Sequence, residues 1–180
     1  SSQLAIIASL DTAAGLYNRS KCQEIFNNTS PATSGQKPAV VVIDLNDLKK
    51  INDQQGHRVG DELIITFARI LQKASSIYPV KPFLGRYGGD EFVVYLTNVE
   101  NDDLIDKFMT ELSRLTAEFN QTETKKFTVS YACGYAINKD GAEGLSTRQL
   151  FDEADEEMYK NKRDMKKKLE ESKQTETEGS

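Results

Sequence analysis

The spacing of apolar side chains along the chain predicts an alternation of helices and strands. Apolar residues three or four positions apart predict amphipathic helices over residues 16–28, 60–75, 104–119 and 147–169. In the second helix the buried stripe is expected to consist of Leu63, Ile64, Phe67, Ala68 and Leu71. A short helix is expected over residues 47–53, a surface loop over 30–37 and a disordered tail over 170–180.

Apolar runs without this helical spacing predict the strands. Residues 38–44 (PAVVVID) form a continuous, valine-rich run that is typical of a strand buried on both faces. Shorter runs predict strands over residues 83–87 and 91–97, joined by two glycines at 88–89. Adjacent glycines permit the positive φ angles of a tight hairpin turn. A further strand is expected over residues 127–137.

The composition indicates a single folded, water-soluble domain. Of the 180 residues, 38% are hydrophobic and 28% are charged, with 11 Gly and 4 Pro, and a chain of this length buries a substantial core. No apolar run approaches the ~20 residues of a membrane span, and the N-terminus lacks the basic segment of a signal peptide. We therefore expect a cytoplasmic location for this chain, while membrane tethering of a longer parent protein stays open.

Charge and cysteine spacing argue against two further classes of protein. The net charge of −5 repels a nucleic-acid backbone, so no nucleic-acid partner is expected. Cys22 and Cys133 lie far apart without a CxxC or Cys–His spacing, which favours reduced core thiols over a metal site or a disulfide. Basic residues are concentrated between Lys160 and Lys168, where they either complement the dipole of the last helix or bind phosphate.

Three carboxylates follow the expected strand ends. Asp44 closes the buried strand, and Asp90 and Glu91 follow the glycine pair. If these strands are neighbours, two such charges ~4 Å apart repel by about 4 kcal/mol at an effective dielectric constant of 20. A hard cation such as Mg²⁺ relieves this repulsion and is bound by carboxylates together with substrate phosphates. The alternative is that Asp44 caps a helix and Asp90 fills a turn.

A second group of polar residues lies between these carboxylates in the sequence. Lys49 and Asn52 share one face of the short helix, and His57 and Asp61 are four residues apart beyond a glycine. Lysine supplies positive charge for phosphate, and a buried aspartate accepts two adjacent N–H groups of guanine. The alternative is that Asp61 only stabilises a helix N-terminus and that His57, the single histidine, lies in a loop.

Several motifs resemble the GGDEF family of diguanylate cyclase catalytic domains. The segment RYGGDEF at residues 86–92 matches the family signature, and DTAAGLYNR at 11–19 resembles the motif at the start of the domain. DLNDLKKINDQQGHRVGD at 44–61 resembles the metal and guanine segment. VSYACGYA at 129–136 and ADEEMYKNK at 154–162 resemble the later strand and the closing helix. The resemblance therefore extends over most of the chain.

The resemblance implies roles for individual residues. It implies a Mg²⁺ or Mn²⁺ site at Asp44, the main-chain carbonyl of Leu45 and Asp90. Asp90 is also the expected proton acceptor, and Glu91 is expected to support catalysis at the metal or beside it. Asn52 and Asp61 are expected to recognise guanine. Further substrate contacts are expected from Asp47, Leu48, Lys49, His57, Lys162 and Lys166.

The fold implied by the resemblance is an α/β (α+β) domain with a mixed central sheet of about five strands wrapped by helices, related to adenylyl cyclase and polymerase palm cores. Residues 11–169 would form the catalytic domain, after a helical stub of a missing upstream segment at 1–10. The implied reaction joins two GTP molecules into cyclic di-GMP and releases two pyrophosphates. It requires a homodimer of facing domains, normally controlled by an upstream sensor. The alternative is a catalytically weak GGDEF domain that binds GTP and regulates a partner.

The sequence departs from the family pattern at several positions. Leu48 replaces a usual phenylalanine, and Asn46 stands where aspartate is usual. Met and Lys at 165–166 replace a usual Gly-Arg, so a bidentate phosphate contact becomes a point charge, and weaker GTP binding is expected. The segment 79–82 reads PVKP where the inhibitory product site has RxxD. Product inhibition by that route is therefore not expected.

Other nucleotide and metal classes lack their motifs in this chain. The sequence contains neither GxGxxG nor GxxxxGK[ST], which excludes the common dinucleotide and P-loop sites. Residues 44–48 (DLNDL) lack the alternating ligands and the glycine of a calcium-binding EF-hand.

Overall fold

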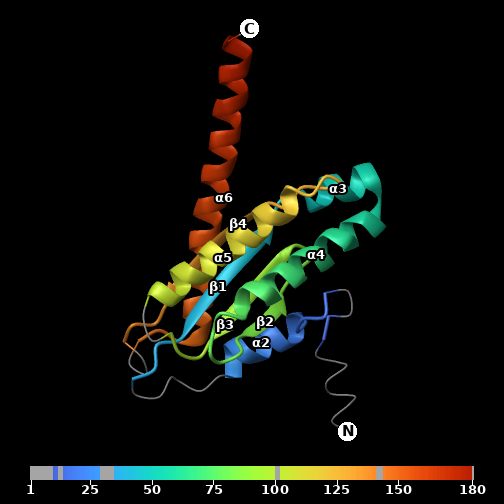
Figure 1. Ribbon diagram of the computed structural model, residues 1–180. Coiled ribbons are helices and arrows are strands. Elements are labelled where there is room, and N and C mark those ends of the chain that lie inside the picture. Colours follow the sequence, from blue (N-terminus) through green and yellow to red (C-terminus); the bar gives the residue numbers. More distant parts are fainter. Residues whose placement is uncertain (1–9, 12–13, 29–34, 100–101, 141–143, 180) are drawn as a thin grey trace.

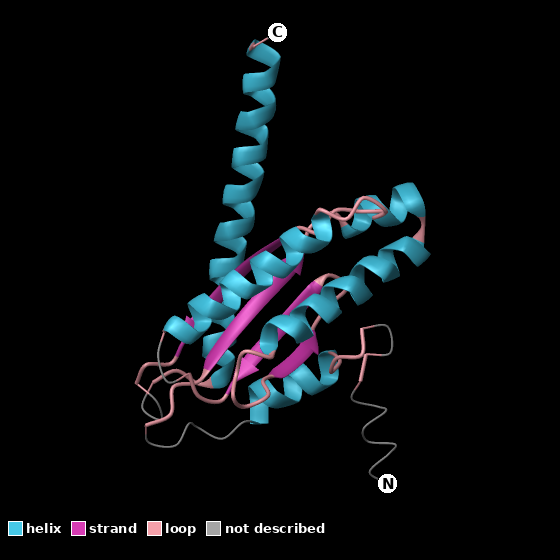
Figure 2. Ribbon diagram, viewed as in Figure 1, coloured by secondary structure: helices cyan, strands magenta, loops and turns pink. Residues whose placement is uncertain are grey.

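The computed structural model describes residues 10–11, 14–28, 35–99, 102–140 and 144–179, and its centre is a four-stranded sheet (Figures 1 and 2). The strand order is β2-β3-β1-β4. The strands are β1 (Ala39–Leu45), β2 (Phe83–Arg86), β3 (Glu91–Leu96) and β4 (Tyr131–Ile137). The helices are α2 (Arg19–Asn28), α3 (Leu48–Gln55), α4 (His57–Ser75), α5 (Asp103–Asn120) and α6 (Thr147–Glu178).

Helices cover both faces of the sheet, and the alternation of side chains along β1 explains how. Val41 and Ile43 belong to a core that includes residues of α4 and α5. Val40 and Val42 belong to a second core, which α2 and α6 close on the opposite face. Because successive side chains of a strand point to opposite faces, Asp44 lies on the face that α6 covers.

The helical stripe and the buried strand are confirmed, whereas the sheet differs from the expectation in two ways. All residues of β1 are buried, and so are the predicted stripe residues of α4. Each pair of strands in the described part of the chain is antiparallel, so the sheet is not mixed there. The described residues form four strands rather than about five, because Tyr17 makes only an isolated bridge with Gly85 at the sheet edge.

The strand expected from residue 127 begins only at Tyr131. The side chain of Asn120 explains the difference, because it bonds both the N–H and the carbonyl of Val129 over 2.8 Å. These main-chain groups are therefore not available for a strand partner.

The turn between β2 and β3 also differs from the expectation, since neither glycine at 88–89 has a positive φ. The N–H groups of Tyr87 and Gly88 donate instead to the carbonyl of Glu91 over 2.8 and 3.4 Å. The described glycines that do have positive φ are Gly15, Gly35 and Gly56.

Helix α6 is longer than expected. It spans 32 residues, and its C-terminal half extends away from the sheet (Figure 1). Residues 170–178, expected to be disordered, are helical in the structure because they include Glu, Lys and Gln and contain neither glycine nor proline. The expected stub at residues 1–10 lies outside the described residues except for Leu10. Within the described part of the chain, each helix is too short or too polar to cross a bilayer.

Candidate active site

The ends of two neighbouring strands bring the three predicted carboxylates together. Asp44 in β1 lies opposite Glu91 in β3 in the antiparallel register. The main-chain N–H of Leu45 donates to the carbonyl of Asp90 over 2.8 Å, which holds the residue before β3 against the end of β1. The carboxylates of Asp44, Asp90 and Glu91 consequently interact electrostatically.

Asp44 is the most buried residue of the three, with 4% of its surface exposed. Its Oδ2 accepts a hydrogen bond from Nζ of Lys162 over 2.5 Å. Its Oδ1 is also buried, and no described group bonds to it. Because an unpaired buried carboxylate oxygen is costly, this atom is suited to a ligand that brings positive charge.

Burial and mutual repulsion make the other two carboxylates harder to ionise. Burial, followed by the negative charge of Asp44, raises the pKa of Asp90. Burial, followed by the charges of Asp155 and Asp44, raises the pKa of Glu91, and the nearby Arg19 opposes this shift. Ionisation of all three carboxylates together is therefore unfavourable in this partly buried site.

These donors fit a hard divalent cation. Mg²⁺ binds oxygen ligands, commonly one or two carboxylates together with substrate phosphates, and Asp44 and Asp90 provide two carboxylates. The described residues contain no group of three or more His, Cys, Asp or Glu side chains that could hold a metal ion. The predicted set is instead two carboxylates and the main-chain carbonyl of Leu45.

An open pocket of about 860 Å³ lies beside the carboxylates, and its volume is typical of small-molecule sites. It is bounded by the end of β1, the first turns of α3 and the exposed part of α6. The residues predicted from sequence that line it are Leu45, Asp47, Leu48, Lys49, Asp90, Lys162 and Lys166. Lining residues that were not predicted are Asn46, Lys50, Asp53, Gln54, Ser130, Met165 and Leu169.

The start of α3 has a strained backbone at this pocket. Asp47 has a φ of 65°, the only positive φ among the described residues other than glycine. The preceding Asn46 is anchored to Ser130 by a main-chain bond and a side-chain bond, both 2.9 Å long. Left-handed backbone at a residue with a Cβ is frequent at functional sites, and free amides at a helix start bind anions. The geometry therefore suits phosphate.

Asn52 and Asp61, which were predicted to recognise guanine, do not line this pocket, and neither does His57. Asn52 packs on Gly60, where an added Cβ would be only 1.7 Å from its Oδ1, and this contact places Asn52 near Asp61. His57 and Asp61 are exposed in the first turns of α4. The expectation of a buried aspartate is wrong, because Asp61 lies on the outer surface of the helix and not on its core stripe.

Arg86, whose role the sequence pattern did not reveal, holds the turn that carries Asp90. Its guanidinium donates to the carbonyl of Gly89 over 2.7 and 3.2 Å and pairs with Asp11 over 3.2 Å. The carboxylate of Asp11 also accepts the N–H of Ala14. The motif at the start of the domain is thus tied to the residue before Asp90. Asp11 and Arg86 both belong to recognisable motifs, but no spacing rule connects them.

A glycine contact positions the basic end of α6. An added Cβ at Gly134 in β4 would lie 2.2 Å from the main-chain nitrogen of Met158, so the strand and the helix approach closely only because residue 134 is glycine. Lys162 lies one helical turn beyond Met158. The close approach therefore brings its ammonium group over the end of β1, where it reaches Asp44.

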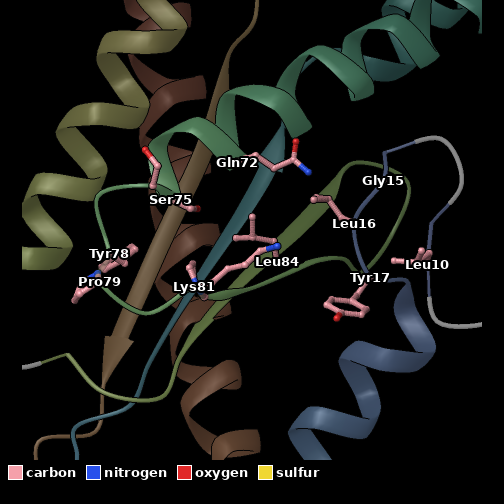
Figure 3. A pocket seen from close by; sticks show the side chains of 12 residues that line it. Leu10, Gly15, Leu16, Tyr17, Gln72, Ser75, Tyr78, Pro79, Lys81 and Leu84 are labelled. Atoms are coloured by element: carbon pink, nitrogen blue, oxygen red, sulfur yellow. The ribbon is translucent and has the colours of Figure 1, made fainter. Parts of the chain in front are cut away.

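A second pocket, of about 570 Å³, lies between the motif at the start of the domain and the loop before β2 (Figure 3). Its walls are mainly apolar and include Leu16, Tyr17 and Leu84, and the described residues that line it are not acidic. Pro79 and Pro82, which replace the ends of the RxxD motif, also line it.

The sequence model of the family described as "Diguanylate cyclase, GGDEF domain" matches residues 8–168. The chain belongs to this family. It is 30% identical over 163 residues to "Diguanylate cyclase DgcS" of Shewanella oneidensis, a match that covers 89% of this chain and 51% of DgcS. It is 29% identical over 157 residues to "Cyclic di-GMP phosphodiesterase PdeR" of Escherichia coli, covering 87% of this chain and 23% of PdeR. The chain thus spans about half or less of the length of these relatives.

Solved GGDEF domains share the fold. The GGDEF domain of DgcB from Caulobacter crescentus, solved in complex with c-di-GMP, has a TM-score of 0.67 and 24% identity, with 87% of this chain and 91% of that chain covered. The FimX GGDEF domain from Pseudomonas aeruginosa has a TM-score of 0.69 and 17% identity, with 87% and 94% covered. The α/β fold of this family is therefore established for the chain.

Proposed function

We propose that this domain is a diguanylate cyclase, which joins two GTP molecules into cyclic di-GMP and releases two pyrophosphates. The observation that carries the proposal is the buried Asp44, with one unpaired oxygen, next to Asp90 at a pocket that four lysines line. Membership of the GGDEF family supports the same reaction. The lysines are Lys49, Lys50, Lys162 and Lys166.

Asp44, the Leu45 carbonyl and Asp90 would hold Mg²⁺ or Mn²⁺. When bound, the ion supplies positive charge beside the α-phosphate and lowers the pKa of the attacking 3′-hydroxyl. Lys49, Lys162 and Lys166 add charge toward the triphosphate, and the amides of Asp47 and Leu48 bind its terminal oxygens.

Asp90 accepts the proton of the 3′-hydroxyl as the oxygen attacks the α-phosphorus of the second GTP. A general base must lie within hydrogen-bond reach of the proton that it accepts, and Asp90 lines the pocket beside Asp44. Glu91 adds negative charge beside it. Asn52 and Asp61, which do not line the pocket, recognise guanine, and His57 contacts the substrate.

Each GTP attacks the other, so two GTP-loaded copies of the domain must face each other. We propose a homodimer that is either transient or enforced by a sensor domain. The greater length of the relatives supports the presence of such additional segments in the parent protein. The segment 79–82 lacks the arginine and aspartate of the product site, so cyclic di-GMP should not inhibit through it. A reaction that consumes GTP places this domain in the cytoplasm.

The test is incubation of the full chain with GTP and Mg²⁺ at high protein concentration, followed by chromatography of the nucleotides. Cyclic di-GMP should accumulate with two pyrophosphates per molecule. Asp90→Ala should lower turnover by about 10²- to 10⁴-fold and keep part of the GTP binding. Asp106→Ala, an exposed acidic residue of α5, is the matched control and should behave like the unmodified chain.

Two outcomes would contradict the proposal. Near-normal synthesis of cyclic di-GMP by Asp90→Ala would show that Asp90 is neither a required metal ligand nor the required proton acceptor. GTP binding without product by the unmodified chain, at every protein concentration, would favour a regulatory GTP-binding module instead.

A further inference from the structure

Lys162 lies within reach of two different anions in the candidate site. Its Nζ donates to Oδ2 of Asp44 over 2.5 Å, and Asp44 is the buried carboxylate that is proposed to hold the divalent ion. The same lysine lines the pocket that is proposed to receive the triphosphate. One ammonium group therefore has two anionic partners, and both belong to the reaction.

A divalent ion and the Lys162 ammonium group would bind the same carboxylate, that of Asp44. Oδ1 of Asp44 is the buried oxygen to which no described group bonds, so it is the atom from which a cation would be bound. An ion at Oδ1 and an ammonium at Oδ2 would repel each other strongly, because charges this close interact through little water in a buried site. Simultaneous full occupation of both oxygens is therefore unfavourable.

The Lys162 side chain is free to change partners without movement of the helix. It is 29% exposed, whereas that of Asp44 is 5% exposed, and lysine carries its charge on a flexible four-carbon chain. Movement from Asp44 toward the pocket needs only side-chain rotations. Asp44, in contrast, is held in the centre of the sheet by pairing on both sides of β1.

We propose that Lys162 is a positioning residue that pairs with Asp44 until a divalent ion binds there, and then transfers to the triphosphate. This inference rests on the proposed function of the site. The pairing disfavours binding of the ion alone, and the triphosphate offers the displaced ammonium a new partner. Metal and nucleotide binding thereby reinforce each other, and the site fills with the metal–nucleotide complex rather than with metal first.

Lys166 provides a matched comparison on the same helix. It lines the same pocket and carries the same charge four residues further along α6. The hydrogen bonds and ion pairs of the described residues connect Asp44 to Lys162 and not to Lys166. A general effect of positive charge on metal binding would involve both lysines, whereas the proposed exchange involves only Lys162.

The first test measures binding of Mn²⁺ alone by electron paramagnetic resonance of the free ion. The unmodified chain is compared with Lys162→Gln and Lys166→Gln, because glutamine removes the charge and keeps a hydrogen-bond donor. Lys162→Gln should bind Mn²⁺ at least about tenfold more tightly than the unmodified chain. Lys166→Gln should show a much smaller change. Unchanged or weaker binding by Lys162→Gln overturns the proposal.

The second test measures how Mn²⁺ and nucleotide affect each other. Calorimetry gives the affinity for a non-hydrolysable GTP analogue with and without Mn²⁺, and the ratio is the coupling, which is reciprocal by thermodynamic linkage. This coupling should fall by about tenfold in Lys162→Gln and stay near that of the unmodified chain in Lys166→Gln. Equal coupling in all three proteins contradicts the exchange.

A readout in the unmodified chain covers the case in which Lys162→Gln does not fold. The Nζ resonance of Lys162, followed in ¹⁵N-lysine-labelled protein, should shift when Mg²⁺ and the analogue are added together; an unchanged resonance overturns the proposal. The outcomes also separate this inference from the proposed function. If metal and nucleotide binding are coupled but no cyclic di-GMP forms, the proposed exchange of Lys162 is supported and the proposed diguanylate cyclase activity is contradicted. If cyclic di-GMP forms but the coupling is unchanged in Lys162→Gln, only the exchange is contradicted.

Discussion

At the scale of single residues, burial distinguishes the acidic side chains of the site. Asp44 is almost inaccessible and interacts with Lys162 and Asp90, whereas Asp61 is exposed at the start of α4. A buried carboxylate needs a cation to compensate for lost hydration. An exposed carboxylate is accessible to the nucleobase of a nucleotide that binds from solvent. The two aspartates therefore suit different parts of a metal–nucleotide complex.

Asp61→Ser should weaken the preference for GTP over ATP. Adenine leaves a guanine-binding carboxylate unpaired, and a lost hydrogen bond to a charged group corresponds to about 10- to 100-fold in selectivity. We expect this range rather than the larger discrimination of a buried site, because Asp61 is exposed. Competition between equimolar GTP and ATP, with homodimeric and mixed cyclic dinucleotides quantified, gives the ratio.

The neighbouring Glu62→Ser serves as the control for base selectivity, since Glu62 pairs with Lys126 outside the site. If Asp61→Ser and Glu62→Ser produce the same nucleotide ratio as the unmodified chain, Asp61 acts only as an acidic residue at a helix start.

The two thiols are free, with Cys22 buried and Cys133 partly buried, and the domain should lose stability above pH 9. Burial raises the pKa of Cys22 from 9.0 to about 12 and that of Cys133 from 9.0 to about 11. The folded chain therefore keeps protons that the unfolded chain releases above pH 9.0. This stabilisation is complete below pH 9 and is lost as the pH rises toward 11 to 12.

Urea unfolding between pH 8 and pH 11 measures this effect. Above pH 9 each thiol should lower the free energy of unfolding by about 1.4 kcal/mol per pH unit, and Cys22→Ala should have a shallower slope than the unmodified chain. Identical slopes would show that Cys22 does not retain its proton in the folded state.

At the scale of secondary-structure elements, glycine contacts bring the functional helices close to their neighbours. Gly60 lets α4 pack against Asn52 of α3, and Gly134 lets α6 pack against β4. Both contacts lie next to predicted site residues, Asp61 in one case and Lys162 in the other. Element packing, rather than loop conformation, therefore sets these two positions.

Gly134→Ala should destabilise the domain by about 1–3 kcal/mol. The added methyl group would lie 2.2 Å from the nitrogen of Met158, so α6 must move away from β4, and the contact between Lys162 and Asp44 should weaken with it. Urea unfolding measures the stability, and cyclic di-GMP synthesis should fall in parallel. Gly89→Ala, with no atom within 4 Å of the added Cβ, is the stability control and should change by less than about 0.5 kcal/mol. Equal stabilities would contradict the packing argument.

At the scale of the whole molecule, the pocket is open to solvent, and one domain supplies one set of the residues that we propose bind metal and guanine. This arrangement leaves room for a second GTP-loaded domain, which the proposed reaction requires.

The specific activity should therefore rise with protein concentration while the domain is mostly monomeric. Because two loaded domains must meet, a tenfold dilution should lower product formed per domain by about tenfold in this range. Initial rates over a dilution series, together with light scattering to report the oligomeric state, check this expectation. Constant specific activity in a monomeric preparation would mean that one domain completes the reaction alone.

The amino-acid sequence by itself determined the stripe of α4, the buried strand β1 and the family signature. It also determined the order of the helices and strands, but not the start of β4 or the length of α6. Apolar spacing reports which side of a helix or strand is buried, and this information is local. The convergence of Asp44, Asp90 and Glu91 was also accessible, because each residue stands at a strand end. Local patterns erred where a single distant side chain intervened, as Asn120 does at the start of β4.

Only the tertiary structure decided which side chains meet. Lys162 and Asp44 are 118 residues apart, and Arg86 and Asp11 are 75 apart. The exposure of Asp61 likewise depends on how α3 and α4 pack around Gly60. Such contacts follow from sheet order and from the closeness of helix to strand, and no short-range periodicity encodes either. The residue types in the sequence therefore indicated the chemistry of the site, whereas the pairing of its charges depends on the packing of elements that are distant in the chain.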